Sequence, residues 1–489
     1  MRKYFTRACI AVAASVPLAT MGVSGASASA SRPARAPVAA TPQAAVPGAQ
    51  LWTERYNGPG GGADVANAVA VSPDGKTAFV TGYSLGTTST DYATIAYDTA
   101  TGKKLWAARY DGPAHYIDEA SSVAVSPDGK TVFVTGYSFS SEEVVAGYAT
   151  IAYDAATGHQ LWVSRYAGPL KTNEADATSV AVSPDGTTVF VTGYTYGPAK
   201  YNDYATIAYD AATGHQQWVS RYNGPASSVD DATSVKVSPD GTTVFVTGKS
   251  TGKGSGFNYA TIAYSAATGH QQWVSRYKGP VGNDAAASLA ISPDGSTVFV
   301  TGYSYRTVST SGADYATIAY SAATGHQLWV SRYNGPDHAQ DQANSLAVSP
   351  DGKTVYVTGE SDTAPATSAY DYATVAYDAA TGHQQWASRY AGPGTNNVAT
   401  SLTVNPATGT VYVTGYSYTT TTAGNDYATI AYNPASGHQL WASRYDGPLH
   451  QGDEALSVAV SPATGTVFVT GESGAGGTVP DYATVAYHG

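Results

Sequence analysis

Residues 152–169 read AYDAATGHQLWVSRYAGP, and variants of this stretch recur along most of the chain. In every copy the tryptophan is followed, three residues later, by an Arg-Tyr pair. The copies contain all eight tryptophans of the protein: Trp52, Trp106, Trp162, Trp218, Trp273, Trp329, Trp386 and Trp441. Successive tryptophans are 54 to 57 residues apart. Such a regular spacing is typical of a repeat architecture.

One repeat unit, residues 121–166, carries four segments with the composition of strands. The first two, 122–126 and 131–135, are joined by a Pro-Asp-Gly turn, in which Pro presets φ and Gly accepts a positive φ. The other two, 148–153 and 160–166, are joined by Ala-Thr-Gly. β-branched and aromatic residues fill these segments, and the unit has no 3.6-residue apolar period. Each unit therefore predicts four antiparallel strands, called A, B, C and D here in chain order.

The A and B segments are apolar on both faces, so each sheet must be covered on both sides. Sheets stacked face to face around an axis meet that requirement, which predicts an all-β fold, a single eight-bladed β-propeller. The eighth unit ends after its C segment, residues 482–487, and the first D segment, residues 51–56, has no C segment before it. We expect residues 51–56 to complete the eighth blade and to close the ring.

The junction of the C and D segments resembles a known motif. Ala96, Asp98, Gly102 and Trp106 stand at the spacing of the tryptophan-docking motif of pyrroloquinoline-quinone (PQQ) dehydrogenases, which are eight-bladed propellers. The chain is also similar to secreted bacterial PQQ-like repeat proteins. The resemblance covers residues 51–489 at the level of the repeat and supports the propeller.

The resemblance also implies a quinone held between a Trp and a vicinal Cys-Cys disulfide, with Ca²⁺ and a catalytic Asp. In this chain every Trp belongs to the repeat, and the only cysteine is Cys9. We therefore expect neither PQQ nor Ca²⁺ as a cofactor. A PQQ-dependent oxidoreductase is kept as an alternative function.

The first 50 residues differ from the repeats. Arg2, Lys3 and Arg7 precede an apolar run over residues 8–23, and small residues follow it, which predicts a signal peptide over 1–30 and a secreted, extracellular protein. The run is shorter than the ~20 residues that span a bilayer. Residues 31–50 are rich in Ala and Pro and predict a flexible leader. The propeller is expected over 51–489.

The net charge restricts the partners. It is −11 for the whole chain, and after residue 50 there are 20 basic and 36 acidic side chains, a net of −16. A surface this acidic repels phosphate backbones, which argues against nucleic acid. A small polar ligand, a glycan or a protein remains as the partner, and we expect a monomer without a membrane span.

Strand direction sorts the connections between strands onto two faces. The A–B and C–D turns are short and alike, whereas the B–C and D–A connections vary and share the other face. We expect the ligand site on that variable face, because binding commonly uses loops on a rigid scaffold. The B strands end there on Tyr83, Tyr137, Tyr194, Lys249, Tyr303, Glu360, Tyr416 and Glu472. The five tyrosines either form an aromatic surface for glycans or pack between blades.

The fourth repeat unit departs most from the others. Lys249 stands where five units have Tyr, Lys253 lies in the B–C loop, and Lys236 replaces an alanine of the A strand. In an acidic molecule these lysines predict an anionic or polar ligand, or an acidic partner segment, near blade 4. Glu472 is expected across the axis from them.

Two sets of aspartates repeat along the chain. One set precedes the A strands, and we expect it to bond loop backbone N–H groups rather than Ca²⁺: Asp64, Asp118, Asp176, Asp230, Asp284, Asp341 and Asp453, with Asn397 in the seventh unit. The other set starts the C strands and predicts one ion pair per blade with the D-strand arginine: Asp91, Asp203, Asp314, Asp371, Asp426 and Asp481.

No His-Glu-x-x-His or P-loop motif occurs in the sequence. The repeats are too alike to reveal a catalytic group. We therefore predict a secreted, non-catalytic binding or interaction module. Glycan binding through the tyrosines is a second alternative, beside the PQQ-dependent oxidoreductase.

Overall fold

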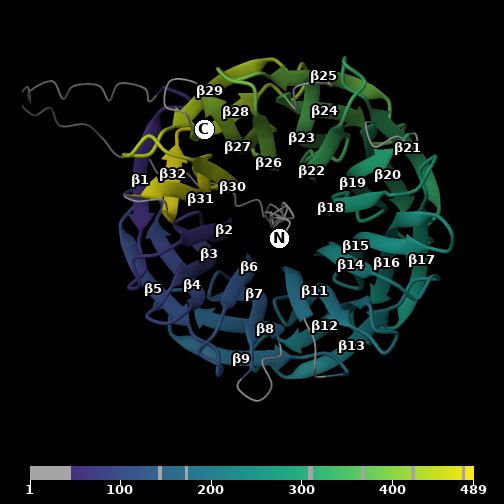
Figure 1. Cartoon of the computed structure of the whole chain (residues 1–489), viewed down its shortest axis with the longest axis horizontal. Helices are drawn as coiled ribbons and strands as arrows, with labels where there is room; N and C mark the ends of the chain where they lie inside the picture. The colour runs from purple at the N-terminus through teal and green to yellow at the C-terminus, as the bar shows by residue number, and fades with distance from the viewer. Residues whose placement is uncertain are drawn as a thin grey trace, which may run out of the picture.

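The computed structural model describes residues 46–140, 146–170, 175–306, 312–364, 369–419, 424–475 and 479–489. These residues form eight four-stranded antiparallel sheets arranged as blades around a central axis (Figure 1). The predicted eight-bladed propeller is thus confirmed. The expected signal peptide, residues 1–30, and most of the expected leader lie outside the described residues.

Each blade contains its strands in the order A to D from the axis outward. The innermost A strands of blades 1 to 8 are β2 (Asp64–Val71), β6 (Asp118–Val125), β10 (Ala175–Val182), β14 (Asp230–Val237), β18 (Ala285–Ile291), β22 (Asp341–Val348), β26 (Asn397–Val404) and β30 (Asp453–Val460). The B strands are β3 (Thr77–Leu85), β7 (Thr131–Phe139), β11 (Thr188–Tyr196), β15 (Thr243–Gly252), β19 (Thr297–Tyr305), β23 (Thr354–Ala364), β27 (Val411–Thr419) and β31 (Val467–Ala475).

The outer half of each blade follows the same repeat. The C strands are β4 (Thr90–Asp98), β8 (Ala146–Asp154), β12 (Asn202–Asp210), β16 (Gly256–Ser265), β20 (Ala313–Ser321), β24 (Ala369–Asp378), β28 (Gly424–Tyr432) and β32 (Val479–Tyr487). The D strands are β5 (Lys104–Tyr110), β9 (Gln160–Tyr166), β13 (Gln216–Tyr222), β17 (Gln271–Tyr277), β21 (Gln327–Tyr333), β25 (Gln384–Tyr390), β29 (Gln439–Tyr445) and, for blade 8, β1 (Gln50–Tyr56).

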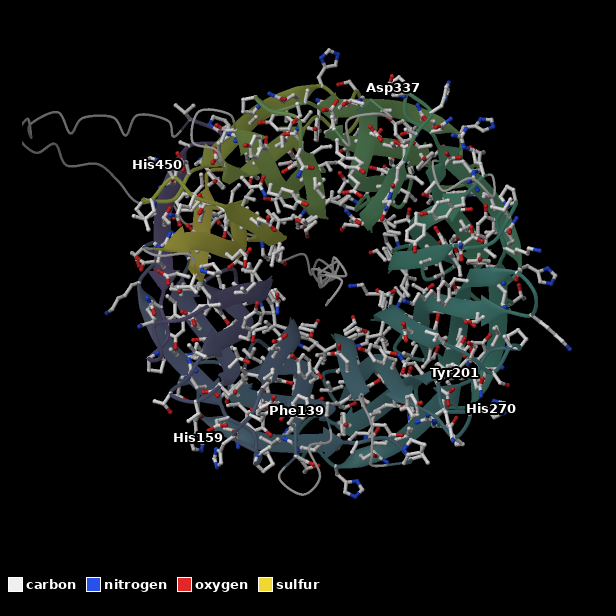
Figure 2. All side chains as sticks on the ribbon, viewed as in Figure 1. Phe139, His159, Tyr201, His270, Asp337 and His450 are labelled. Carbon is white, nitrogen blue, oxygen red and sulfur yellow. The ribbon has the colours of Figure 1, made fainter. Side chains whose placement is uncertain are left out.

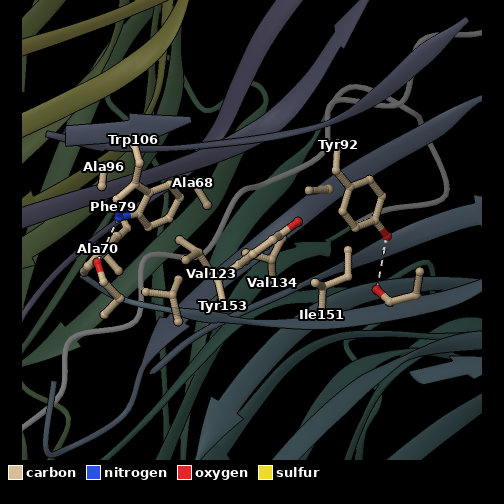
Figure 3. Close-up of a cluster of buried hydrophobic side chains, with 14 residues drawn as sticks. Ala68, Ala70, Phe79, Tyr92, Ala96, Trp106, Val123, Val134, Ile151 and Tyr153 are labelled. Atoms are coloured by element: carbon tan, nitrogen blue, oxygen red, sulfur yellow. Dashed lines mark hydrogen bonds between the residues drawn. The ribbon is translucent and has the colours of Figure 1, made fainter. Parts of the chain in front are cut away.

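The tryptophans join neighbouring blades. Trp106 lies between Phe79 of its own blade and Tyr153 of the next, with ring centroids 5.8 and 6.2 Å away (Figure 3). Its indole Nε1 donates to the backbone carbonyl of Ala155, at 2.9 Å. Between described residues this bond to the next blade is formed by seven tryptophans. The recurring tryptophan is therefore a packing residue, as its fixed position in the repeat predicts.

A second contact repeats nearer the middle of each blade. The buried hydroxyl of Tyr92, at the start of β4, donates to the carbonyl of Ala149 in the next blade, at 3.1 Å (Figure 3). Alanines such as Ala68 and Ala96 fill the same interface. Their small side chains let the two sheets approach closely enough for the tyrosine hydroxyl to reach a backbone that is itself paired in a sheet.

The ring closes between the first and the last strand. β1 pairs with β32 along its whole length and completes the sheet that β30, β31 and β32 begin. Trp52 packs against Phe468 of its own blade and Tyr97 of blade 1. This confirms the expected closure by residues 51–56.

The closing contact begins earlier than the boundary expected at residue 51. The amide of Gly48 donates to the carbonyl of His488 at 2.7 Å, and the amide of His488 donates to that of Ala49 at 2.9 Å. In blade 1, Gly102 and Asp98 hold the same two places of a covalent C–D turn. Residues 48–52, GAQLW, therefore supply the glycine of the eighth C–D turn as well as its tryptophan.

Candidate functional site

The connections fall on two faces of the disc, as expected. We call the face with the B–C and D–A connections the loop face, and the face with the A–B and C–D turns the turn face. The histidines of the C–D turns lie far apart: His159 and His270 stand at the periphery of the disc, in different blades (Figure 2). They cannot share a ligand.

The aspartates that start the C strands are structural. Each of the six forms an ion pair with the D-strand arginine of its own blade, at 2.8 to 3.1 Å. In blade 2, where Gly147 takes this position, Arg165 instead donates to the carbonyls of Ser138 and Phe139. The predicted ion pair is thus confirmed in all six blades that carry the aspartate.

The aspartates that precede the A strands brace the loops. Asp64 accepts the amides of Gly58 and Leu85, at 2.8 and 3.0 Å, and Asp118 accepts that of Gly112 at 2.7 Å. Burial raises the pKa of Asp118, and likewise that of Asp341, to about 6. The interpretation as backbone braces is confirmed for these positions.

Asp176 does not belong to that set. In blade 3 the position of Asp118 is held by Ala175, and Asp176 pairs across the strands with Tyr194, as Glu119 pairs with Tyr137 in blade 2. The expectation that Asp176 braces a loop was therefore wrong, because it stands one residue after the position of Asp118. Asp176 therefore faces the inner end of the B strand.

Eight such cross-strand pairs surround the axis at the loop face, and we call them the mouth ring. Each joins an A-strand residue to the B-strand end singled out by the sequence: Val65/Tyr83, Glu119/Tyr137, Asp176/Tyr194, Asp231/Lys249, Ala285/Tyr303, Gln342/Glu360, Val398/Tyr416 and Glu454/Glu472. The ring holds six carboxylates and one ammonium. It is the innermost surface that the loop face presents.

Two of these carboxylates are uncompensated. Burial, with Asp341 and Asp362 nearby, raises the pKa of Glu360 to about 7. Burial and the opposite carboxylate of Glu454 raise the pKa of Glu472 to about 7 as well. Among the described residues neither side chain has a hydrogen-bond donor or a cation beside it. Glu454, by contrast, accepts a bond from Asn425 at 2.8 Å.

The lysines of blade 4 do not form the positive group that the sequence suggested. Lys249 lies 3.0 Å from Asp231 and 5.1 Å from the ring centre of Phe257, so its charge is compensated within the blade. Lys253 is exposed in the B–C loop. Lys236 is five residues along β14 from Asp231, roughly 15 Å towards the turn face at the usual rise of a strand.

The five tyrosines of the mouth ring are half-buried. Tyr194 donates to Asp176 at 3.4 Å, and Tyr303 packs edge-to-face on Tyr305, with centroids 5.9 Å apart. Burial, together with Glu454 and Glu360, raises the pKa of Tyr416. The tyrosines thus stand among the carboxylates rather than on a separate aromatic surface.

Two aspartate clusters lie further out on the loop face. Their carboxylate oxygens come within 4.8 Å of one another: Asp91, Asp111 and Asp118, and again Asp426, Asp446 and Asp453. The donors already present in the first cluster are Arg109, His115 and the amide of Gly112, at 2.7 to 2.8 Å. These bonds account for the cluster without a cation.

The turn face is hollowed between blades. A hollow of about 500 Å³ lies between blades 4 and 5, lined by Ser238, Thr243, Phe245 and Gln272 on one side and by Asp294 and Ala322 on the other. Its counterpart between blades 1 and 2, beside Phe79, measures about 280 Å³. These hollows could not be predicted from the sequence, because they arise where the C–D turn of one blade meets the A–B turn of its neighbour.

Comparisons with known proteins agree with this fold. A family model described as "Outer membrane protein assembly factor BamB" (PQQ_2) matches residues 38–199, 96–311 and 205–475. Tetrathionate hydrolase of Acidianus ambivalens is 29% identical over 135 residues, which is 27% of this chain and 21% of that protein. The match therefore spans about a fifth of that relative.

Solved propellers are similar at the level of the fold. The quinohemoprotein alcohol dehydrogenase ADHIIG from Pseudomonas putida HK5 is 13% identical, with a TM-score of 0.53 over 90% of this chain and 76% of that one. Sqt1 from Chaetomium thermophilum is 12% identical, with a TM-score of 0.58 over 90% and 99%. At these identities the likeness is one of architecture alone.

Proposed function

We propose, from the premise that this chain belongs to the PQQ_2 family of repeat propellers, that it is an exported, non-catalytic binding module whose mouth ring holds a cationic ligand. A segment of protein rich in Lys or Arg is the ligand class that suits this ring best. Among the described residues, no helix has the length and apolarity that crossing a bilayer requires.

The observation that carries the proposal is the charge of the mouth ring. Six carboxylates face one ammonium, and that ammonium is already paired with Asp231. Glu360 and Glu472 stand half-buried in blades 6 and 8 with like charges beside them. A cation placed beside either of them would supply the donor that this carboxylate lacks, and it would gain more there than at an exposed carboxylate because the surroundings are less polarisable.

The tyrosines strengthen the same proposal. Tyr416, in blade 7, stands between these two blades and close enough to Glu360 and Glu454 for their charges to raise its pKa. Phenol faces attract ammonium and guanidinium groups. We therefore propose a cationic ligand in place of the anionic ligand that Lys249 suggested. The proposed site stays on the loop face, at the B-strand ends.

The residues present do not fit the quinone site that the resemblance implied. The indole rings are packed between blades, and seven donate their N–H to a backbone carbonyl, so a quinone has no free tryptophan face. The vicinal disulfide has no counterpart either, because Cys9 is the only cysteine. No oxidoreductase step is derived for this chain.

Glycan binding remains a second candidate, on the strength of the tyrosines. Tyr137 packs on Phe139 and Tyr303 on Tyr305, each pair edge-to-face. Such pairs present apolar ring surface next to hydroxyl and carboxylate acceptors, a combination that suits sugar rings. A glycan would bind without the salt dependence that a cationic ligand must show.

The test uses the folded protein and two synthetic peptides, one rich in Lys and Arg and one rich in Glu. Calorimetric titration should detect the basic peptide and not the acidic one, with affinity falling as salt rises. The double variant Glu360→Gln with Glu472→Gln should weaken binding at least tenfold. Asp337→Asn is the matched control, since Asp337 is an exposed acid at the periphery of the disc (Figure 2). Unchanged binding by the double variant would refute the proposal.

A further inference from the structure

The second aspartate cluster lies where the D–A connection leads from blade 7 into blade 8. Asp426 belongs to β28, Asp446 directly follows β29, and Asp453 opens β30. One carboxylate oxygen of each residue comes within 4.8 Å of the others. His450, in the same connection, lies away from the axis of the disc (Figure 2). Three separate segments of the chain thus bring their negative charges to one place on the loop face.

The donors present in this cluster do not reach all of its oxygens. Arg444 lies 2.8 Å from Oδ2 of Asp426, and backbone amides donate to both oxygens of Asp453. His450 Nδ1 lies 2.6 Å from Oδ2 of Asp446. The Oδ1 atoms of Asp426 and Asp446 are buried, and among the described residues neither has a hydrogen-bond donor. Asp426 as a whole is only 5% exposed.

The first cluster does not share this defect. Neither oxygen of Asp91 is buried without a donor, and the side chain of Asp111 is 40% exposed, so water can solvate it. Asp118 has the hydroxyl of Ser138 beside it. In the second cluster, burial raises the pKa of Asp426, and the charge of Asp446 adds to the effect. The second cluster is therefore the one that lacks positive charge.

A related cluster between blades 5 and 6 shows what can fill such a place. The equivalent positions there are Asp314, Asn334 and Asp341. Arg332 Nε lies 3.0 Å from Oδ2 of Asp314, as Arg444 does from Asp426 in kind, and Arg306 Nε lies 2.8 Å from Oδ1. Both oxygens of Asp314 thus face a guanidinium. In blade 7 the position of Arg306 is held by Thr419, which carries no charge.

We propose that Asp426, Asp446 and Asp453 bind a Ca²⁺ ion, which takes the place that the guanidinium of Arg306 holds between blades 5 and 6. Ca²⁺ binds carboxylate and water oxygens at about 2.4 Å, so ligands on opposite sides of the ion are about 4.8 Å apart. The oxygens of the cluster fit within that span. The side chain of Asp446 is 30% exposed, so solvent can supply the remaining ligands.

The ion would be structural, apart from the Ca²⁺ that the resemblance placed beside a quinone. It would tie β28 to the loop after β29 and to the first residue of β30. Asp453 keeps its bonds to backbone amides and adds the third negative charge. The site does not depend on the mouth ring or on the ligand proposed there.

Calorimetric titration of the full chain with CaCl₂, after treatment with EGTA, tests the site. We expect one ion to bind per chain, with a Kd on the order of 10⁻⁴ to 10⁻³ M, as in extracellular Ca²⁺ modules. The melting temperature should rise with the Ca²⁺ concentration, because the ion binds only the folded state. Mg²⁺ should bind at least tenfold more weakly, since it requires shorter distances and a stricter geometry.

Variants locate the ion. Asp446→Asn should weaken Ca²⁺ binding at least tenfold and still fold, because Asn334 holds the same position between blades 5 and 6. Asp111→Asn is the matched control, since it makes the same change in the first cluster, and it should leave the affinity within twofold. The double variant Glu360→Gln with Glu472→Gln should also bind Ca²⁺ like the natural protein, which separates this site from the mouth ring.

Three results would overturn the proposal. The absence of both heat and a rise in melting temperature up to about 10 mM CaCl₂ would exclude the site. Unchanged binding by Asp446→Asn, or an equal loss with Asp111→Asn, would exclude its location. Equal affinities for Mg²⁺ and Ca²⁺ would exclude the assignment to Ca²⁺.

Discussion

The amide of Gly48 donates to the carbonyl of His488 at 2.7 Å, across the place where the first and last described strands meet. Gly102 and Asp98 make the equivalent bond within one continuous turn, at 2.9 Å. The closed ring therefore reproduces, between two separate segments, the geometry that a covalent turn gives in the other blades. The glycine is required because its φ is +79° and because the indole of Trp441 lies directly against it.

Gly48→Ala should destabilise the ring. A Cβ at this position would meet Trp441 Cδ2 at 2.8 Å, and a positive φ adds backbone strain. Gly61→Ala is the matched control, since Gly61 has a φ of +60° and open space around it. Thermal unfolding should show a loss of about 1 kcal/mol for the control and clearly more for Gly48→Ala. Equal losses would mean that contact with Trp441 contributes nothing.

Replacing a D-strand arginine should lower the free energy of unfolding more in a blade where the arginine pairs with a buried aspartate. Arg444→Met strands the carboxylate of Asp426, which we expect to cost about 3 kcal/mol, because a buried charge loses its partner. Arg165→Met in blade 2 breaks no ion pair with a C-strand aspartate, since Gly147 stands at that position, and should cost about 1 kcal/mol. Denaturant unfolding at pH 7 compares the two, and a larger loss for Arg165→Met would contradict the assignment.

The mouth ring should make stability depend on pH. The pKa of Glu360 and of Glu472 is raised to about 7 in the folded protein, from an ordinary value of 4.5. The folded state thus holds these protons more tightly, so this contribution to stability is full below pH 4.5 and is lost as the pH rises through 7. The double Gln variant should melt on the order of 2 °C above the natural protein at pH 8 and level with it at pH 4. The reverse order would contradict the raised pKa values.

Lys236 should have the opposite dependence. Its folded pKa of about 8 lies below the ordinary 10.5, so the unfolded chain binds the proton more tightly and stability increases as the pH rises from 8 to 10.5. Lys236→Ala should therefore stabilise the protein at pH 7, on the order of 1 kcal/mol after allowance for solvent screening. The gain should shrink towards pH 10. A gain that is constant with pH would point to packing rather than charge.

The fold was accessible from the sequence because each structural contact repeats. Trp106 and its seven counterparts mark the D strands. Their regular spacing also shows that the eighth unit lacks a D strand of its own. The ion pair of Arg109 with Asp91 followed from counting residues across one short turn. Gly48 escaped notice because the turn it completes is split between the two ends of the chain.

Only half of the residues of the mouth ring could be predicted from the sequence. The B-strand ends, from Tyr83 to Glu472, were found because they break the repeat, but their A-strand partners were not. Glu119, Asp231 and Glu454 become visible once the register of the strands is known. The neutralisation of Lys249 by Asp231 depends on that register, and Asp176 was misplaced because its blade is offset by one residue.

The pairing of β1 with β32 determines when the ring can close during translation. Of the described strands, the one that leaves the ribosome first finds its partner only after residues 479–487 have been synthesised. Until then Trp52 can pack on Tyr97 of blade 1, but it lacks Phe468 and β32 on the side of its own blade. A product of premature termination that lacks β32 would keep this seam open. The seam can therefore form only after translation has reached β32.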